Sequence, residues 1–421
     1  FQHDVGHENA VLVHVTLIPY LKASEELKTK PTQASVKELQ GMGLQPDVLV
    51  CRSEYPIPDE VKAKIALFCN VPVYHVLQNL DVEYLYEAPL AMEKERLAQV
   101  VCECLNIPCP EPQLGDWKQM VDALKNPTSE VTIALVGKYI QLHDAYLSVM
   151  EALKHGGIAN RTKVSIKWVD SEFLTPESLD DTFAGVDGII IPGGFGSRGT
   201  EGMILAANYA RENKIPFLGI CLGMQMAMVA FARNVLGYED ANSSELNPDT
   251  THPVVDLMPD QNGIENLGGT LRLGSYPCVL DKKSKAYALY GTELINERHR
   301  HRFEINNHYR DDFTSHGMMI SGQSPDGHIV EMIELPDHPF YVGIQAHPEL
   351  KSRPNHAHPL FAGFVESAEE QGVLRRAKKL LMKRNHLSEP EAHRYLQKTS
   401  MDTGRTMTES AHMVTMLIQE D

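Results

Sequence analysis

"IPFLGICLGMQMAM", residues 215–228, is the stretch that decides the fold we predict for the centre of this 421-residue chain. An apolar run ends at Gly219, a single cysteine follows at Cys221, and small and apolar residues with helical character come next. A G-x-C-x-G pattern between an expected strand and an expected helix is typical of a nucleophile elbow, with sulfur in place of oxygen. The alternative is a buried structural cysteine, which is how we interpret the other six cysteines.

A sharp turn at Cys221 would lift its side chain to the carboxyl edge of a parallel sheet, where ligands of such folds bind. The helix N-terminus that follows favours the thiolate, which is the nucleophilic form. "YVGIQAHPEL" (341–350) ends another expected strand with His347 and Glu349. Their spacing of two predicts that both side chains lie on one face of an extended segment. Glu349 can then orient the imidazole while His347 transfers the proton, which makes a Cys221–His347–Glu349 triad.

Strand-like and helix-like segments alternate along most of the chain. The expected strands are 10–17, 46–53, 130–139, 163–170, 186–191 and 215–220, and the clearest expected helices are 61–69 and 145–157. This alternation predicts an α/β fold with a doubly wound, mostly parallel sheet. Residues 106–129 contain five prolines or glycines among polar residues, which suits a linker.

"IIIPGGFGSRG" (189–199) contains G-x-G-x-x-G after a buried strand, so a dinucleotide site has to be weighed. The next strand ends in Cys221, and no acidic residue stands there to hold a ribose hydroxyl. We favour backbone N–H groups near Gly193 and Gly194 that serve as an oxyanion hole. On the glycines alone, a plain turn explains the segment equally well.

Composition narrows the class of protein. The chain is 43% apolar and 23% charged, and its net charge of −17 argues against non-specific nucleic-acid binding by the body of the protein. Seven irregularly spaced cysteines do not make a disulfide framework, so we expect a reducing, cytoplasmic compartment. No apolar run approaches the ~20 residues of a membrane span. Residues 373–405 differ, with nine Lys/Arg against three acids, and mark a candidate domain boundary.

"PGGFGSRG", "GICLGMQ" and "QAHPEL" occur in this order, and together they resemble the class I glutamine amidotransferase family. The resemblance implies attack of cysteine on the amide of glutamine, release of ammonia and hydrolysis of a γ-glutamyl thioester. Ala346 stands where family members often have Phe, a change that we expect the site to tolerate.

The flanking sequence resembles the CTP synthase family from about residue 2 to about residue 370. The segments that carry this are "HVTLIPYLKASEELKTKPTQASVKEL", "PDVLVCRSE", "AKIALFCNVP", "ALVGKYIQLHDAYLSVMEALKHGG", "EGMILAANYAREN", "ANSSELNPD", "LGGTLRLG" and "ERHRHRFEINN". The resemblance implies that ATP phosphorylates O4 of UTP and that ammonia from glutamine displaces the phosphate. It also implies activation by GTP, feedback inhibition by CTP and a homotetramer.

The same resemblance implies site residues. They are Gly194, Leu222, Gly223, Met224, Gln225, Glu245 and Arg302 for glutamine; Lys28, Thr29, Lys30, Pro31, Thr32, Gln33 and Lys64 for UTP or CTP; Asp81 and Val82 for the adenine side of ATP; and Phe195 and Arg198 in a lid that closes with GTP. Glu245 suits the ammonium and Arg302 the carboxylate of glutamine. Without the resemblance, "KTKPTQ" (28–33) would be an exposed basic loop. Ala34 replaces the usual His, which puts one nucleotide contact in doubt.

Two absences qualify these expectations. "RHRHR" (298–302) could suggest a metal site, but His299 and His301 lack nearby partners of ligand type, so we expect no metal. The chain begins with Phe, and we find no G-x-x-x-x-G-K-[ST] to grip ATP phosphates. We expect the ATP loop and the magnesium ligands to belong to the full-length family enzyme, and these 421 residues alone not to make CTP.

The tail "AKKLLMKRNHLSEPEAHRYLQKTSMDTGR" resembles the ANTAR family, a three-helix RNA-binding module. Leu374, Ala377 and Leu381 repeat at helical spacing. Ser388 with Glu391 and Thr406 with Glu409 form capping boxes for two further helices. A structured RNA is the implied partner, with phosphate contacts from Arg375, Arg376, Lys378, Lys379, Lys383 and Arg384. A basic helical hairpin for oligomer packing and a join of two reading frames are the alternatives.

We therefore predict four parts: the C-terminal part of a synthase (amidoligase) domain at 1–110, a linker at 111–129, a class I glutamine amidotransferase domain at 130–370 and an ANTAR-like three-helix domain at 371–421. The predicted function is that of CTP synthase, with its glutaminase half complete. A stand-alone cysteine hydrolase of γ-glutamyl compounds is disfavoured by "KTKPTQ" and residues 1–105. An RNA-binding antitermination regulator with an amidotransferase-like sensor is disfavoured by the intact triad.

Overall fold

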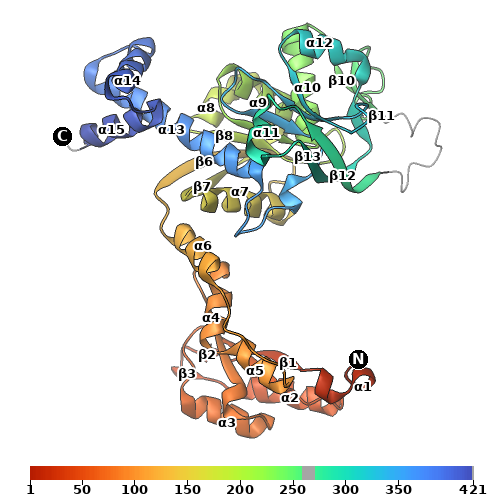
Figure 1. The fold of residues 1–421 in the computed structure, drawn as a ribbon, viewed down its shortest axis with the longest axis vertical. Coiled ribbons are helices and arrows are strands. Elements are labelled where there is room, and N and C mark those ends of the chain that lie inside the picture. Colours follow the sequence, from red (N-terminus) through yellow and green to blue (C-terminus); the bar gives the residue numbers. More distant parts are fainter. Residues whose placement is uncertain (258–270, 420–421) are drawn as a thin grey trace. The chain divides into compact units, whose positions relative to one another are not determined.

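The computed structural model describes residues 1–257 and 271–419, and the beginning of the "LGGTLRLG" segment lies outside them. The chain forms two compact units, Phe1–Val121 and Asp122–Asp421 (Figure 1). Within the described part of the chain, we find no helix with both the length and the apolar character needed to cross a membrane.

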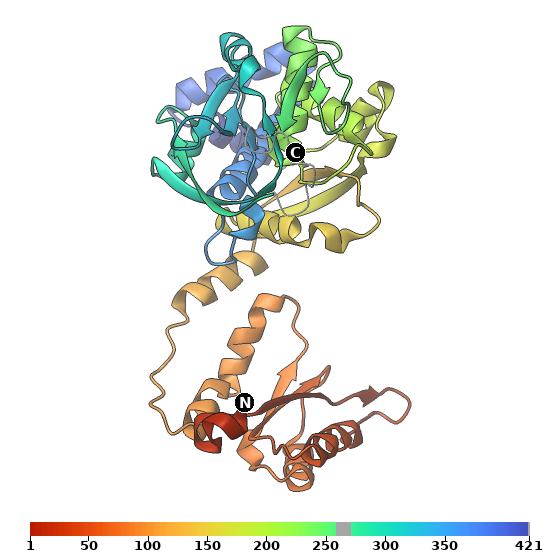
Figure 2. The same ribbon diagram turned by 90° about the vertical axis from the view of Figure 1, so that its right-hand side faces the viewer.

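The first unit is built on a parallel sheet in the order β1 (Val13–Leu17), β4 (Val48–Ser53), β5 (Val76–Leu80) (Figure 2). Its helices and hairpin strands are α1 (Gln2–Val5), α2 (Lys30–Gly41), α3 (Asp59–Cys69), α4 (Ala88–Lys94), α5 (Leu97–Cys104), β2 (Tyr20–Leu21) and β3 (Glu26–Leu27). Leu49 and Cys51 of β4 pack against α2 and α3, and Val48 packs against α5. The central strand is therefore covered on both faces, as parallel sheets require.

A helix, α6 (Gly115–Lys125), lies inside the segment that composition marked as a linker. Met120 and Val121 are buried, and Trp117 donates a hydrogen bond from Nε1 to the carbonyl of Tyr86 at 2.8 Å. The prolines lie only before and after this helix and Gly115 is its first residue, so their count over the whole segment concealed a short amphipathic stretch.

The second unit contains, among its described residues, a nine-stranded sheet in the order β13-β12-β15-β16-β17-β9-β8-β6-β7. The strands are β6 (Ser129–Gly137), β7 (Thr162–Asp170), β8 (Gly188–Ile191), β9 (Phe217–Ile220), β12 (Arg272–Leu280), β13 (Leu294–His301), β15 (Met319–Gln323), β16 (Val330–Glu334) and β17 (Tyr341–Ile344). The run from β17 to β7 is parallel, and the run from β16 to β13 continues it antiparallel. The predicted α/β class is confirmed, with an antiparallel extension.

Helices cover both faces of this sheet (Figure 1). One face packs against α7 (Leu147–Ala159), α11 (Lys285–Tyr290) and α13 (Pro359–Asn385); the other packs against α9 (Thr200–Glu212), α10 (Leu222–Phe231) and α12 (Arg310–Ser315). A short helix α8 (Leu179–Phe183) and a small sheet of β10 (Asn242–Ser243), β11 (Pro253–Leu257) and β14 (Phe303–Ile305) complete the unit.

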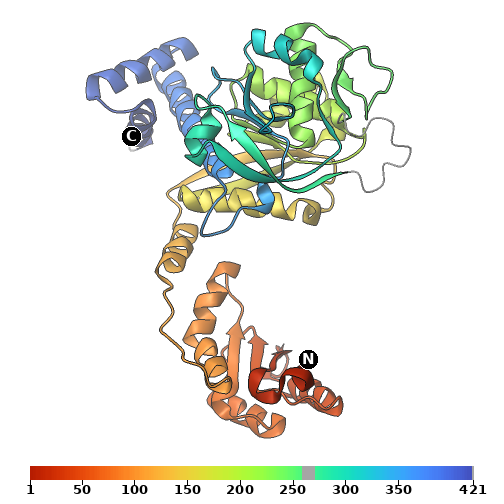
Figure 3. The ribbon, with the colours of Figure 1, turned by 45° about the vertical axis from the view of Figure 1, so that its right-hand side comes forward.

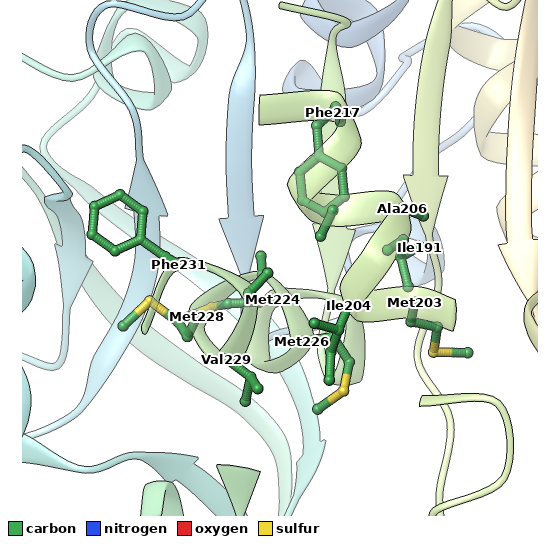
Figure 4. Close-up of a cluster of buried hydrophobic side chains, with 14 of the residues drawn as sticks. Ile191, Met203, Ile204, Ala206, Phe217, Met224, Met226, Met228, Val229 and Phe231 are labelled. Carbon is green, nitrogen blue, oxygen red and sulfur yellow. The ribbon is translucent and has the colours of Figure 1, made fainter. Parts of the chain in front are cut away.

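Helix α10, which follows the cysteine, is buried along its whole length. Figure 4 shows its Met224, Met226 and Met228 packed in the cluster that also contains Ile204 of α9 and Phe217 of β9. A helix that is apolar on every side belongs in a core. The packing holds the start of α10, and with it Cys221, against the carboxyl end of the central strands.

The tail differs in one respect from the expected three separate helices. Its first helix is the end of α13, which begins at Pro359 and passes through the predicted boundary at 370 without a break (Figure 3). Helices α14 (Glu389–Thr403) and α15 (Met407–Gln419) follow, each with the predicted capping box. The composition changes at residue 373, and Gly372, directly before it, is accommodated inside the helix, so neither feature ends α13. The three helices share an apolar cluster of their own: Val373, Ala377, Leu381, Ala392, Leu396, Ala411 and Val414.

Candidate active site

Cys221 has the strained backbone of a nucleophile elbow, with φ of 50° and ψ of −103°. Its N–H donates to the carbonyl of Ile344 on β17 at 2.7 Å. A Cβ on Gly223 would lie 2.0 Å from the carbonyl oxygen of Ile191, and one on Gly219 would lie 2.8 Å from the backbone of Gly223. Three backbone segments approach one another closely here, so the two glycines of G-x-C-x-G are required. The surrounding structure keeps Cys221 in its strained backbone conformation.

His347 and Glu349 meet directly after β17. His347 Nδ1 and Glu349 Oε1 are 2.7 Å apart, a hydrogen bond that sets the imidazole tautomer. The backbone differs from the extended segment that we expected, because Glu349 lies in a 3-10 turn, Pro348–Leu350. The proline starts this turn, and it brings the carboxylate back toward the ring.

The surroundings of His347 favour the imidazolium, the charged form of its ring. Burial alone would lower its pKa, but the interactions with Cys221 and Glu349 outweigh burial and raise the pKa to about 10. Nδ1 is bonded to Glu349, which leaves the buried Nε2 as the ring nitrogen available to Cys221. A charged imidazole beside a thiol favours the thiolate, the form in which cysteine attacks a carbonyl.

The glycine loop after β8 passes against these residues. A Cβ on Gly193 would lie 2.8 Å from Cε1 of His347 and 3.5 Å from Cβ of Cys221. A Cβ on Gly194 would lie 3.1 Å from the side chain of Lys138. The loop backbone thus lies beside the thiol, where an oxyanion hole would have to be, and the hole itself stays a prediction.

Lys138, at the end of β6, holds this loop and was not among the residues we predicted from sequence. Its Nζ donates to the carbonyls of Phe195 at 2.9 Å and Gly196 at 2.6 Å. Burial and the nearby charge of Arg198 lower the pKa of Lys138 to about 8. The sequence offered one signal for this role: the lysine directly follows "VG" at the end of an expected strand. Arg198 in turn donates to the carbonyl of Lys138 and to Glu172, both at 2.7 Å.

Glu245 and Arg302 come from different elements and lie near enough to interact electrostatically. Glu245 follows β10, Arg302 separates β13 from β14, and their charges attract. Burial raises the pKa of Glu245, although the N–H of Gly196 and the charges of Lys138 and Arg302 oppose the rise. Opposite charges beside the loop suit the ammonium and carboxylate of an amino acid.

The other expected glutamine ligands lie on α10. Leu222 and Met224 are buried side chains of the core. Gln225 is also buried, and its Nε2 donates to the carbonyl of Phe303 at 2.9 Å and to Oε1 of Gln345 at 3.2 Å. Gln345 donates in turn to the Cys221 sulfur, a contact that we did not predict from sequence.

A cavity of about 350 Å³ opens beside the triad. Its lining includes Gly193, Gly194, His347 and Glu349, together with Phe195 of the expected lid. Arg300 lies 5.8 Å above the Phe195 ring, which is cation–π distance. The cavity is therefore bounded by the same loop that carries the proposed oxyanion hole and the proposed lid.

The "RHRHR" histidines are parts of a buried polar cluster. His299 Nδ1 lies 3.2 Å from His301 Nε2, and Arg272 is bonded to Glu331 at 2.6 Å. Burial and the charge of Arg272 lower the pKa of His299 to about 2 and that of His301 to about 3. Throughout the part of the chain that the structure describes, no group of three or more His, Cys, Asp or Glu could hold a metal ion.

The expected nucleotide residues gather at the N-terminus of α2. Lys28 pairs with Glu26, and Lys64 acts on the same carboxylate, which brings both lysines to one place. Thr32 is buried and its hydroxyl donates to the carbonyl of Leu17 at 3.1 Å, so that hydroxyl is used inside the fold. Lys30 is exposed. Free N–H groups at a helix start beside lysines suit phosphate.

The two adenine-side residues, Asp81 and Val82, form no comparable group with the others. Asp81 pairs with Arg52 at 3.0 Å, on the exposed side of β4 and β5, and Val82 follows it. Gln33 donates to Thr29 at 3.1 Å. The structure therefore brings together the UTP residues more clearly than the two adenine-side residues.

The basic residues of the tail divide into two groups. The guanidinium of Arg375 is bonded to the buried Asp187, which precedes β8, and Arg376 lies 3.6 Å from the same carboxylate. Lys378 pairs with Glu389 at 3.0 Å. Lys379, Lys383 and Arg384 are exposed. The first group is therefore engaged in ion pairs with the carboxylates of Asp187 and Glu389.

Three family descriptions match this chain: "CTP synthase N-terminus" over residues 1–107, "Glutamine amidotransferase class-I" over residues 141–367 and "ANTAR domain" over residues 364–414. The third match begins inside α13, in agreement with the continuous helix.

Curated relatives and a solved structure are also similar. A CTP synthase of Clostridium beijerinckii and one of Ruminiclostridium cellulolyticum are each 58% identical over 368 residues, which is 87% of this chain and 69% of theirs. The glutaminase domain of a Trypanosoma brucei CTP synthase with bound acivicin is 38% identical, with a TM-score of 0.54; the match covers 56% of this chain and 93% of that one.

Proposed function

Because this chain belongs to the CTP synthase family, we propose that Cys221, His347 and Glu349 hydrolyse glutamine and that the ammonia serves to convert UTP to CTP. The observation that carries the proposal is the 2.7 Å bond from His347 to Glu349 beside a cysteine on a strained elbow.

The chemistry follows from these side chains. The Cys221 thiolate attacks the amide carbon, and the developing oxyanion lies toward the backbone of Gly193 and Gly194. The His347 imidazolium gives its proton to the leaving nitrogen, and ammonia departs to leave a γ-glutamyl thioester. Neutral His347 then takes a proton from water, whose oxygen attacks the thioester; glutamate is released, and the Cys221 thiolate and the His347 imidazolium are restored.

We propose that Glu245 and Arg302 bind the two charged groups of glutamine and that the loop held by Lys138 closes the pocket. The mutual attraction of Glu245 and Arg302, and the hydrogen bond from the Gly196 N–H to Glu245, support this. Phe195 and Arg198 belong to the same loop, and we propose that GTP acts there. The ammonium and carboxylate of glutamine would then interact with these two side chains in place of their present electrostatic attraction to each other.

We also propose that Lys28, Lys30 and Lys64, with the N-terminus of α2, bind the phosphates of UTP or CTP. Supporting evidence is the convergence of Lys28 and Lys64 on Glu26. ATP would supply the phosphoryl group that activates O4 of UTP, with Asp81 and Val82 toward its adenine. Among the described residues, no group of three or more His, Cys, Asp or Glu could hold a metal ion, and we derive no step through a metal. We also propose that the chain forms a homotetramer. The domain boundaries at residues 110, 129 and 370 are likewise part of the proposal.

The first test is glutamate release from glutamine, measured with and without GTP. We expect activity in the parent chain, none in Cys221→Ala, and a rise with GTP. Equal activity in the parent and Cys221→Ala would contradict the proposal. A matched control is Cys109→Ala, which removes an exposed cysteine.

A second function, binding of structured RNA by the tail, is favoured by one observation. The three helices share their own apolar cluster, while the basic residues Lys379 and Lys383 are exposed. In a gel shift of the whole chain with a hairpin RNA, we expect binding that weakens with salt and that Lys379→Glu with Lys383→Glu reduces. Lys163→Glu, on β7, is the control. Failure to bind any hairpin RNA at low salt would reject this function.

A further inference from the structure

Gln345 is a fully buried polar residue beside the nucleophile. It lies between the end of β17 and His347, and its exposed fraction is 0%. Its N–H donates to the carbonyl of Glu331 at 2.8 Å, so its backbone is held by the neighbouring strand β16. Its Nε2 lies 3.6 Å from the sulfur of Cys221, which is hydrogen-bond distance for sulfur.

The orientation of the Gln345 amide follows from a chain of contacts that begins at a backbone carbonyl. The oxygen of Phe303 can only accept, so the atom of Gln225 that faces it at 2.9 Å must be the NH₂ group. The same NH₂ faces Gln345 at 3.2 Å, so the atom of Gln345 there must be the carbonyl oxygen. The other end of the amide, which faces the sulfur, is then the NH₂ donor.

A donor aimed at sulfur has a definite chemical effect. A hydrogen bond to the charged form of a titratable group favours that form. A buried charge is costly unless such partners surround it. The backbone carbonyl of Phe303 cannot change its role, and it therefore imposes a donor on Cys221 through two side-chain amides.

We propose that Gln345 is a further catalytic residue, which stabilises the Cys221 thiolate by a hydrogen bond from its amide, and that Gln225 is a positioning residue that keeps this amide from flipping. The inference rests on the proposed function of Cys221. It also gives Gln225 a task besides the glutamine contact expected from sequence. Both of its N–H groups are used, and only its carbonyl oxygen is left for a ligand.

Other ionisable groups act on the thiol or its partner and have to be kept unchanged. His347 and Glu349 act from the segment after β17. His299 and His301 on β13 interact with His347, and their low pKa values keep them neutral. From the end of β6, Lys138 backs the Gly194 loop. The substitutions at Gln345 and Gln225 replace none of these groups.

The test measures the thiolate in the absence of glutamine. The whole chain is treated with iodoacetamide between pH 4 and pH 10, and alkylation of the peptide that contains Cys221 is followed by mass spectrometry. Gln345→Met keeps the length of the side chain and removes the donor. We expect its alkylation rate at pH 6 to fall roughly 10- to 100-fold, because the rate profile moves to higher pH by about one to two units. A profile that overlays the parent's would overturn the proposal.

Two further variants keep the test decisive. Gln225→Met should move the profile in the same direction by less, because Gln345 can then flip; no movement would overturn the positioning role. If circular dichroism shows that Gln345→Met does not fold, Gln345→Asn takes its place. The shorter side chain withdraws the donor from the sulfur, and an alkylation profile that overlays the parent's would again overturn the proposal. Gln397→Met, at an exposed glutamine of α14, should leave the profile unchanged.

Failure of this inference is distinguishable from failure of the proposed function. Glutamate release that persists in Cys221→Ala would reject Cys221 as the nucleophile. If glutamate release requires Cys221 but Gln345→Met does not move the alkylation profile, only the role of Gln345 is rejected.

Discussion

His347 and Glu349 are joined by a 2.7 Å hydrogen bond across a 3-10 turn that begins at Pro348. The turn, rather than an extended strand, brings the carboxylate to Nδ1 and leaves Nε2 for the thiol. The pair is almost enclosed, with side chains 15% and 8% exposed. A hydrogen bond of this kind between charged groups is about twice as strong as a neutral one.

Glu349→Gln should lower kcat for glutamate release by roughly 10²- to 10⁴-fold, with a small change in KM, because the amide can hold the wrong imidazole tautomer. Steady-state glutamate release at pH 7.5 measures this. Glu177→Gln, on an exposed turn, is the control. A Glu349→Gln variant with kcat within a factor of about three of the parent would show that the orientation of His347 does not depend on this carboxylate.

The stability of the parent relative to His347→Gln should depend on pH. The pKa of His347 is raised from its ordinary value of 6.5 to about 10 in the folded chain. A raised pKa in the folded state contributes stability that is fully present below pH 6.5 and is lost as pH rises toward 10. Urea unfolding at pH 6, 8 and 10 should show a shrinking difference between the two proteins. A difference that grows with pH would contradict the charged state assigned to His347.

Gly223→Ala should destabilise the second unit by about 2 kcal/mol or more, because the new methyl group would lie 2.0 Å from the carbonyl oxygen of Ile191. Thermal unfolding measures the loss. Gly115→Ala places its methyl group in open space and should leave the melting temperature unchanged. Equal melting temperatures for Gly223→Ala and the parent would mean that the elbow can move away from β8.

Lys138→Met should raise KM for glutamine roughly 10- to 100-fold, since the loop loses two charge-assisted hydrogen bonds. The effect on kcat should be smaller, because Lys138 does not touch the triad. The measurement is glutamate release over a range of glutamine concentrations. Lys163→Met, at an exposed position of β7, is the control. An unchanged KM would show that the loop is held without Lys138.

Arg375→Ala should destabilise the second unit by about 1 to 3 kcal/mol, because it leaves the buried carboxylate of Asp187 without its closest cation. Arg376→Ala should cost less, since that guanidinium is 3.6 Å away. Chemical denaturation compares them, with the exposed Lys379→Ala as control. If Arg375→Ala is as stable as Lys379→Ala, the attachment of the tail at Asp187 contributes nothing measurable.

Local patterns were sufficient for much of the fold. Strand β4 (Val48–Ser53), helix α3 (Asp59–Cys69) and the capping boxes at Ser388 and Thr406 lie where the sequence placed them. Each depends on neighbours within a few residues of the chain. Helix α6 was missed because the average composition of a long segment hides a short apolar stripe. The continuity of α13 was missed because a change in composition does not by itself end a helix.

The sequence by itself determined the elbow at Cys221 and its partners His347 and Glu349, because close backbone contact allows only glycine at positions 219 and 223 and because proline turns the chain after His347. Only the tertiary structure decided that Lys138 holds the loop, that Arg375 faces Asp187 and that Gln345 reaches the sulfur. These contacts join residues about 60 to almost 190 positions apart. Their geometry depends on strand order and helix packing, which no local pattern specifies.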